Sequence, residues 1–145
     1  MSGLNEWNQR NQQVIADFRA TEGRLGDDFA AAPVVLVHHV GRRSGKEYVI
    51  PLVYLPKDGD DESVYIFATK GGAPAHPDWY LNLIAAGQAT IEVGASTYLV
   101  TISELSGGER DRVYAEQVRL MPGFGEYATK TAGIRTIPVL ELTRR

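Results

Sequence analysis

Residues 64–77 read Val64-Tyr65-Ile66-Phe67-Ala68-Thr69-Lys70-Gly71-Gly72-Ala73-Pro74-Ala75-His76-Pro77. The apolar run 64–68 predicts a strand, and the pattern from Asp78 to Ala86 predicts a helix. A lysine and two glycines lie between them. Glycine lets a backbone come close to a ligand, and the start of a helix offers free N–H groups to an anion. This junction is therefore a candidate binding site, with a plain connecting loop as the alternative.

Strand and helix patterns extend from this junction in both directions. Helices are predicted from the possible capping box Ser106–Glu109 to about Leu120, and from Phe124 to Lys130. Pro51 predicts a bulge or an edge, because proline cannot donate to a ladder. Six short strands with interleaved helices predict an α+β mixed barrel with helical cover, not a doubly wound sheet. The other five predicted strands are Val34–Val40, Tyr48–Leu55, Gln88–Val93, Thr97–Leu105 and Thr136–Leu142.

Composition narrows the class of protein. The 145 residues suit one domain, and 43% hydrophobic with 23% charged residues is ordinary for a globular protein. A net charge of −3 argues against a nucleic-acid surface. The chain has no cysteine, which excludes disulfides, thiolate nucleophiles and cysteine–zinc sites and is compatible with a cytoplasmic location. No metal site is predicted, and no nucleophile elbow is present.

Residues 1–32 are predicted to form an amphipathic helix and a connector ahead of a barrel domain at 33–145. Trp7, Val14, Ile15 and Phe18 share one helical face. The opposite face is poor in lysine and arginine, so packing on the barrel or on a second subunit is favoured over peripheral membrane contact. The N-terminus lacks the apolar core of a signal peptide.

The loop Gly41–Lys46 carries a basic cluster of Arg42, Arg43 and Lys46 on an acidic chain. Its glycine spacing does not fit a nucleotide phosphate loop. Two interpretations stay open, a solvated hairpin tip or a clamp for phosphate or carboxylate groups. The neighbouring His38 and His39 are predicted to point to opposite faces of their strand, so they do not readily share a metal.

Four motifs in order resemble the deazaflavin-dependent nitroreductase family, whose members are reductases that use the 8-hydroxy-5-deazaflavin coenzyme (F-420). The resemblance runs from about Val34 to Leu142. It implies a split β-barrel of the flavin-reductase or pyridoxamine-oxidase type with covering helices. The motifs are Gly41-Arg42-Arg43-Ser44-Gly45-Lys46, Pro51-Leu52-Val53-Tyr54-Leu55, Ala68-Thr69-Lys70-Gly71-Gly72-Ala73-Pro74 and His76-Pro77-Asp78-Trp79-Tyr80-Leu81-Asn82-Leu83.

The resemblance also implies roles for single residues. The basic pair would meet the phosphate and oligoglutamate tail of the coenzyme, and the second motif would line the coenzyme with its backbone. Tyr127 would lie beside the ring and the substrate, and together with Thr69 it is the expected catalytic pair. The implied coenzyme-binding residues are Arg42, Arg43, Ser44, Tyr48, Val49, Ile50, Pro51, Leu52, Val53, Phe67, Ala68, Thr69, Lys70, Gly71, Gly72, Asp78, Trp79, Tyr80, Leu81, Asn82 and Tyr127.

The implied reaction is hydride transfer to an electron-poor small molecule. By analogy with the family, the acceptors are quinones, enones, coumarin-type lactones and nitroaromatics. Val53, Thr69 and Phe124 depart from the nitroreductase branch, so its bulky nitroimidazole substrates are not carried over. Two alternatives are a flavin mononucleotide reductase on the same barrel and a non-catalytic carrier of a deazaflavin or lipid-like ligand. The edges of a split barrel leave room for a homodimer.

Overall fold

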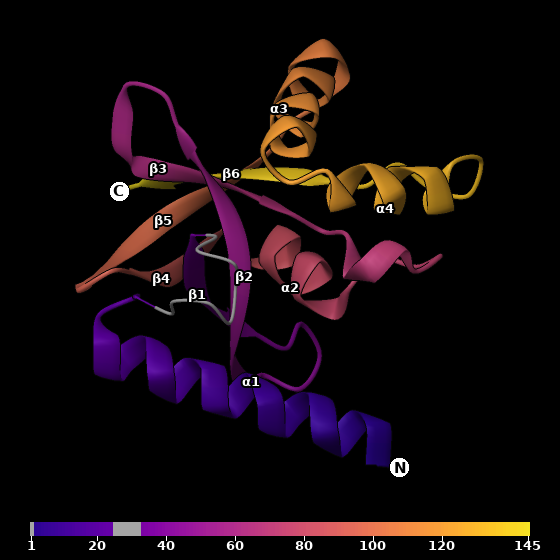
Figure 1. Cartoon of the computed structure of the whole chain (residues 1–145). Coiled ribbons are helices and arrows are strands. Elements are labelled where there is room, and N and C mark those ends of the chain that lie inside the picture. The colour runs from indigo at the N-terminus through magenta and orange to yellow at the C-terminus, as the bar shows by residue number, and fades with distance from the viewer. Residues whose placement is uncertain (1, 25–32) are drawn as a thin grey trace.

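The computed structural model describes residues 2–24 and 33–145, and all of their side chains except those of 2–8, 61 and 62. Six strands form a closed antiparallel barrel in the order β1-β2-β3-β6-β5-β4. α1 precedes the strands, and further helices interrupt them at two places along the chain, between β3 and β4 and between β5 and β6 (Figure 1). The elements are α1 (Ser2–Thr21), β1 (Val34–Val40), β2 (Glu47–Lys57), β3 (Asp60–Phe67), η2 (Lys70–Gly72), α2 (Asp78–Ala86), β4 (Gln88–Val93), β5 (Ser96–Glu104), α3 (Gly107–Leu120), α4 (Gly123–Thr131) and β6 (Val139–Arg144).

Strand β2 changes its partner halfway along. Residues 47–53 pair with β1, whereas 54–57 pair with β3. Among the residues that the structure describes, 47–53 therefore have a strand on one side only, and this open edge splits the barrel. Pro51 lies opposite Leu36 within this half. The predicted edge position of the proline is confirmed, while the register shift in β2 lies further on, between Pro56 and Lys57.

Strand β1 is apolar on both faces because each face is covered. Val35 and Val37 belong to the barrel interior, together with Ile66, Ile91 and Leu140. Val34 and Leu36 point the other way and pack against Ile15 and Phe18 of α1. The alternation of a strand thus supplies two cores from one run of β-branched residues.

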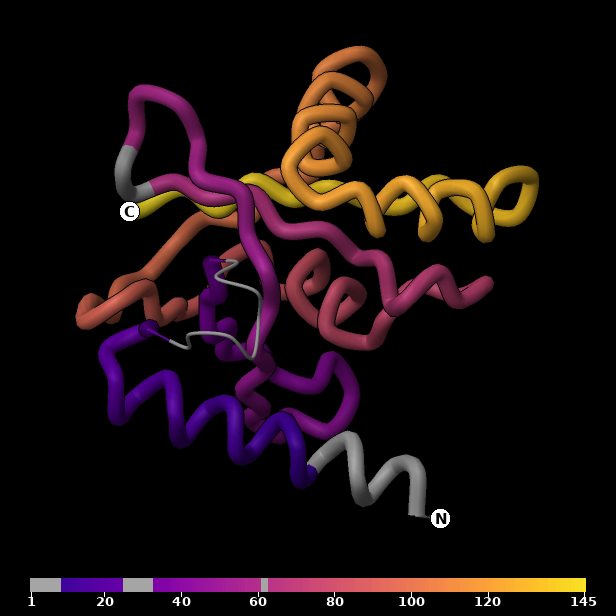
Figure 2. The backbone as a smooth tube through the Cα atoms, viewed as in Figure 1, coloured from indigo at the N-terminus to yellow at the C-terminus, as the bar shows by residue number. Residues whose placement is uncertain are grey.

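The helices cover different parts of the barrel (Figure 1). α1 lies along the outside of the barrel and contacts β2, while α3 and α4 lie on the opposite side of the molecule. α2 contacts three strands of the barrel, β1, β4 and β5. Figure 2 follows the backbone out of β3, past α4 and back into α2, so the short turn η2 lies against α4.

The predicted barrel, the six strands and the four helices are confirmed, with local corrections to their bounds. β6 begins at Val139 and not at Thr136. Arg110 Nε and Nη2 donate to the Ile137 carbonyl at 3.1 and 2.8 Å, and the N–H of Ala68 donates to the Pro138 carbonyl at 3.0 Å. Residues before 139 are therefore held by separate contacts and not by a continuous ladder. β2 extends beyond its predicted bounds at both ends, over Glu47–Lys57.

The predicted capping box is wrong. Ser106 is the N-cap residue of α3, but its side chain makes no capping hydrogen bond. Gly107 follows with a φ of +58°, so the chain turns through a left-handed residue before the helical backbone begins.

The described part of α1 packs on the barrel, one of its two predicted partners, through Ile15 and Phe18, and Val14 of the same helix is buried. The side chain of Trp7 and the connector 25–32 lie outside the described residues. In the part of the chain that the structure describes, none of the helices has the length and apolar character needed to cross a membrane.

Candidate coenzyme site

The loop between β1 and β2 is a closed turn that presents Arg42. The N–H of Gly41 donates to the Lys46 carbonyl at 2.8 Å, and Ser44 Oγ accepts from the N–H of Lys46 at 3.1 Å. The backbone N–H and Nη1 of Arg42 both donate to Asn82 Oδ1 of α2, at 3.1 and 2.9 Å. Asn82 is 4% exposed, so this contact fixes the start of the loop onto α2. Arg43 and Ser44 lie exposed at the tip.

His39 completes this group and was not predicted as a site residue. The Asn82 amide nitrogen lies 3.0 Å from His39 Nδ1. The amide donates there, since its oxygen already accepts from Arg42. The imidazole stacks on Tyr48, with ring centroids 5.3 Å apart and planes inclined by 22°. Burial lowers the pKa of His39, against a smaller opposing effect of Asp78, which favours the neutral acceptor that Asn82 needs.

Residues 68–73 form a second group at the end of β3, which we call the 68–73 loop. Lys70 has a φ of +47° and is one of two non-glycine residues with positive φ in the described chain. Gly71 and Gly72 follow at +62° and +85°. A Cβ at Gly72 would lie 2.8 Å from Lys130 Cδ and 3.5 Å from Tyr127 Cα. Glycine at 72 therefore lets the loop and α4 come close together.

Arg135 holds the 68–73 loop through hydrogen bonds from its side chain to the loop backbone. Its Nη1, Nη2 and Nε donate to the carbonyls of Ala68, Thr69 and Ala73 at 3.0, 2.8 and 3.0 Å. Nη1 also lies 3.0 Å from His76 Nδ1. Burial, and secondly the Arg135 cation, lowers the pKa of His76, so the neutral ring accepts this bond. The sequence motifs did not include Arg135.

Four aromatic rings connect the end of β3 to α4. Phe67 meets Tyr114 and Phe124 edge-on at 5.9 and 5.7 Å, and Phe124 meets Tyr127 at 5.4 Å. The side chain of Phe67 is thus part of the core under α3 and α4, and its contribution to a site is through its backbone. Tyr127 is half-buried, and its hydroxyl has no hydrogen-bond partner among the described residues.

The segment 78–82 contributes unequally to the site. Trp79 and Tyr80 are buried in the barrel interior, where Leu81 packs beside them. The Tyr80 hydroxyl donates to Glu104 at 2.7 Å, and burial together with this bond raises the pKa of Tyr80 to about 12. Asp78 is exposed, 3.5 Å from Arg42 Nη2. The polar ends of this segment, Asp78 and Asn82, therefore face the site.

The open half of β2 lies next to Arg42, Asn82 and His39, which we call the hairpin group. Val49 and Val53 pack on the α1 side, while Ile50 and Leu52 pack on the barrel interior. A ligand along this edge would therefore meet mainly the backbone, with Tyr48 as the exposed side chain at its start.

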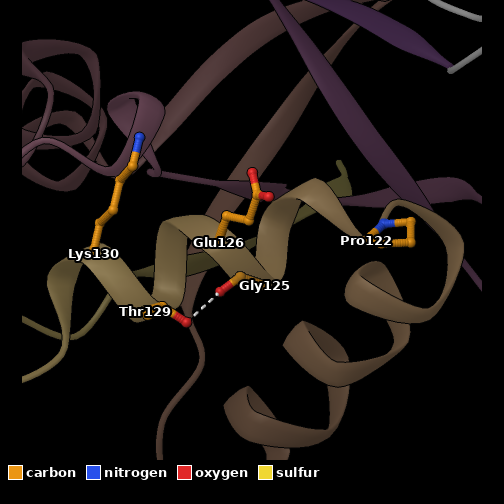
Figure 3. Close-up of a pocket in the computed structure, with 5 residues that line it drawn as sticks. All are labelled: Pro122, Gly125, Glu126, Thr129 and Lys130. Atoms are coloured by element: carbon orange, nitrogen blue, oxygen red, sulfur yellow. Dashed lines mark hydrogen bonds between the residues drawn. The ribbon is translucent and has the colours of Figure 1, made fainter.

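An open hollow of about 720 Å³ lies on α4, next to the 68–73 loop (Figure 3). Glu126 and Lys130 extend from the same side of the helix in Figure 3, and the Thr129 hydroxyl donates to the Gly125 carbonyl at 3.1 Å. Lys130 is also the residue that approaches Gly72, so the hollow adjoins the loop. Its lining residues are Pro122, Gly125, Glu126, Thr129 and Lys130.

Comparison with known proteins gives a consistent group of relatives. A family model described as F420H(2)-dependent quinone reductase matches residues 9–144. The F420H(2)-dependent quinone reductase Rv1261c of Mycobacterium tuberculosis is 34% identical over 152 residues, which cover 98% of this chain and 99% of that protein.

Solved structures agree in fold. The F420-H2 dependent reductase FDR-A is 35% identical, with a TM-score of 0.66 over 76% of this chain and 93% of that one. A second structure, described as a domain-swapped dimer, is 30% identical, with a TM-score of 0.67 over 95% of this chain and 98% of that one.

Proposed function

The chain belongs to the F420H(2)-dependent quinone reductase family, and on that premise we propose that it transfers a hydride from the reduced deazaflavin coenzyme to a quinone. The family assignment agrees with the class of reductase that the four motifs predict and makes the chain an oxidoreductase that uses this coenzyme. The acceptor and the residues that carry out the transfer belong to the proposal.

One observation carries the proposal: the two basic loops are both linked by side-chain contacts to the segment that leads into α2. Arg42 lies 3.5 Å from Asp78, the first residue of α2. Arg135, which holds the 68–73 loop, contacts His76, two residues before Asp78. The loop of Arg42 and the loop of Lys70 are therefore both anchored at residues 76–78. Tyr48, at the start of the open half of β2, stacks on His39, which contacts Asn82 of α2.

The chemistry of these side chains fits the coenzyme. Arg42, Arg43 and Lys70 offer guanidinium and ammonium donors to an anionic tail, which suits phosphate and carboxylate groups. Thr69 is in the right-handed region at φ −73°, and the left-handed Lys70 follows. Successive residues of this kind bring neighbouring N–H groups to one side of the backbone, as in backbone sites for anions. Because the N–H of Thr69 donates to the Phe67 carbonyl at 2.9 Å, those of Lys70 and Gly71 are the ones proposed to meet the coenzyme. A Cβ at Gly71 would meet nothing within 4 Å, which leaves space over the loop.

When bound, the reduced coenzyme supplies a hydride at C5 of its ring. The chain's own residues bind and orient it. In the proposal Arg42 and Arg43 hold the tail, Lys70 and the loop backbone hold the phosphate, and Phe67 and Ala68 support the ring from the strand end. Tyr127, on α4, holds the acceptor through its free hydroxyl. Thr69 lies in the same loop as Lys70.

A quinone is the acceptor that the family name favours. The ring of Tyr127, which meets Phe124 edge-on at 5.4 Å, offers an aromatic surface to it, while the hollow on α4 is lined by other residues of the same helix and by Pro122. Enones, coumarin-type lactones and nitroaromatics share the electron-poor character of a quinone and are the further acceptors to test.

Titration with both coenzymes tests the proposal. Purified protein is titrated with the oxidised deazaflavin coenzyme and with flavin mononucleotide, followed by fluorescence, and we expect tighter binding of the deazaflavin. Reduced coenzyme is then mixed with menadione, and its reoxidation is followed by absorbance. Equal or tighter binding of flavin mononucleotide would favour the flavin reductase. Deazaflavin binding without reoxidation by any of the four acceptor classes would favour the carrier.

A homodimer is part of the proposal as well. The relative described as a domain-swapped dimer supports it. Sedimentation of the full chain across a range of concentrations measures the oligomeric state.

A further inference from the structure

Arg135 lies outside the residues that the family motifs point to, yet it makes the largest set of side-chain hydrogen bonds to the candidate site. Four of its contacts are 2.8–3.0 Å long, and all go to residues 68–76. These partners are 59 to 67 positions away in the sequence.

The backbone after α4 aims Arg135 at the loop. α4 ends at Thr131, and Gly133 follows with a φ of +78°, which reverses the chain. The N–H of Arg135 then donates to the Thr131 carbonyl at 3.0 Å. The backbone of Arg135 is therefore anchored to the C-terminal end of α4, the helix that carries Tyr127.

The bonds of Arg135 act on a backbone that needs support. Three successive residues from Lys70 to Gly72 have positive φ, and lysine pays a steric cost there. Ala68 is fully buried, so removal of the guanidinium would leave its carbonyl buried without this hydrogen-bond partner. Only a planar group with several donors reaches the carbonyls of 68, 69 and 73 together.

We propose that Arg135 is a positioning residue that keeps Thr69 and Lys70 in the backbone conformation that receives the coenzyme. This inference rests on the proposed function. Arg135 acts through the loop and not by touching the coenzyme, and by its attachment to α4 it also sets the distance between the loop and Tyr127.

A matched control is available in Arg110. This arginine also holds a carbonyl of the segment between α4 and β6, that of Ile137, through two hydrogen bonds of 3.1 and 2.8 Å. Its described side-chain bonds go to Ile137 and Asp111, not to the 68–73 loop. Arg110 also lies over the Tyr114 ring, 4.6 Å from its centroid. Arg110→Gln therefore removes a comparable buried contact without touching the 68–73 loop.

The experiment compares Arg135→Gln, Arg135→Lys and Arg110→Gln in the full chain. Fluorescence titration gives the Kd for the oxidised coenzyme, and hydrogen exchange of the coenzyme-free protein follows the amides of residues 68–73. We expect Arg135→Gln to weaken binding by about 10-fold or more, as for one or two lost charge-assisted bonds, and to speed exchange in the loop. Arg135→Lys should lie between it and the wild type. Arg110→Gln should match the wild type in both measurements.

Wild-type affinity in Arg135→Gln would overturn the inference, and so would an equal loss in Arg110→Gln. Full recovery in Arg135→Lys would overturn it too, because charge alone would then suffice. If Arg135→Gln does not fold, Arg135→Lys decides by the same two measurements. A wild-type protein that binds no deazaflavin contradicts the proposed function, and faster loop exchange in Arg135→Gln with an unchanged Arg110→Gln would then still support the positioning of the loop.

Discussion

Arg42 and Arg135, both at the candidate site, differ in what their guanidinium groups face. Arg42 is exposed and bound on one edge by Asn82, with Asp78 at 3.5 Å as its further charged neighbour. Arg135 is half-buried and gives four hydrogen bonds to the protein itself. The first keeps donors for a ligand, while the second uses its donors on the backbone that meets the ligand.

We therefore expect the two arginines to affect coenzyme binding in different ways, Arg42 by direct contact and Arg135 through the backbone of the loop. The hairpin group of Arg42, Asn82 and His39 is held from one side and offers charge, so its loss should weaken coenzyme binding and leave the hydride step intact. The 68–73 loop and α4 form the more closely packed group and carry Tyr127. Changes there should alter turnover at Tyr127 and coenzyme affinity at Lys70. The predictions below test whether the two groups separate in this way.

The largest effect is expected at Tyr127. Tyr127→Phe keeps the ring contact with Phe124 and removes the free hydroxyl. If that hydroxyl delivers the proton or holds the acceptor, turnover should fall by roughly 10²–10⁴-fold, with little change in coenzyme Kd or Tm. Stopped-flow reoxidation of the reduced coenzyme measures it. An unchanged rate and unchanged acceptor affinity would make Tyr127 a packing residue, whereas a changed acceptor KM alone would assign the proton to solvent.

Lys70→Ala should have the next largest effect and should act on affinity. A charge-assisted bond to the coenzyme that is shielded from water is worth about 1.5–3 kcal/mol, or roughly 10- to 150-fold in Kd. Fluorescence titration measures the loss. Lys57→Ala is the control, because Lys57 pairs with Glu141 on β6 at 2.6 Å and should leave Kd unchanged. The same Kd in all three proteins would mean that Lys70 is a solvated surface residue.

Arg42 and Arg43 are neighbours of equal charge, and only Arg42 is held by Asn82. Arg42→Ala should weaken coenzyme binding by about 1 kcal/mol, and Arg43→Ala by less, since an exposed and unrestrained charge contributes little. Both losses should shrink as salt is added. Asn82→Ala should reproduce the loss in Arg42→Ala. Equal effects at 42 and 43 would show that Asn82 does not pre-orient the arginine.

The smallest effect is a dependence of stability on pH. The pKa values of His39 and His76 are lowered in the folded protein, so the unfolded chain binds protons first on acidification. Stability is therefore complete above the ordinary histidine pKa and falls as the pH drops through that value toward the folded ones. His39 faces Asp78 and His38, and His76 faces Arg135 and Glu104. Thermal melts at successive pH values, repeated with His39→Gln and His76→Gln, should show a shallower fall in each variant.

Local patterns were sufficient for the barrel. The run Val34–Val40 and the helix Asp78–Ala86 agree with their predicted bounds because each is bounded by glycine or proline and has a clear period. The hairpin arginines and the Lys70 loop were found for a similar reason, since their residues are contiguous. The start of β6 was misplaced because Ile137 is held by Arg110, which lies 27 positions earlier.

Arg135 and His39 could not be found in this way. The contribution of Arg135 depends on backbone carbonyl groups, which every residue has and which the fold brings to it from 62 to 67 positions away. His39 became a site residue only because Asn82, 43 positions later, turns its amide toward it. A sequence shows which side chains exist, whereas these two contacts depend on which backbone atoms and amides the fold places opposite them.

Pro51 affects how readily the edge of β2 associates with another chain. An open strand edge is a template on which another chain can add a strand and begin to aggregate. The coenzyme edge of β2 must be reachable by a ligand, so a neighbouring strand does not cover it. A proline in the middle of residues 47–53 removes one N–H from that template, and α1 packs against the side chains of Val49 and Val53. The same edge is thereby accessible to a small molecule and a poor partner for a second polypeptide.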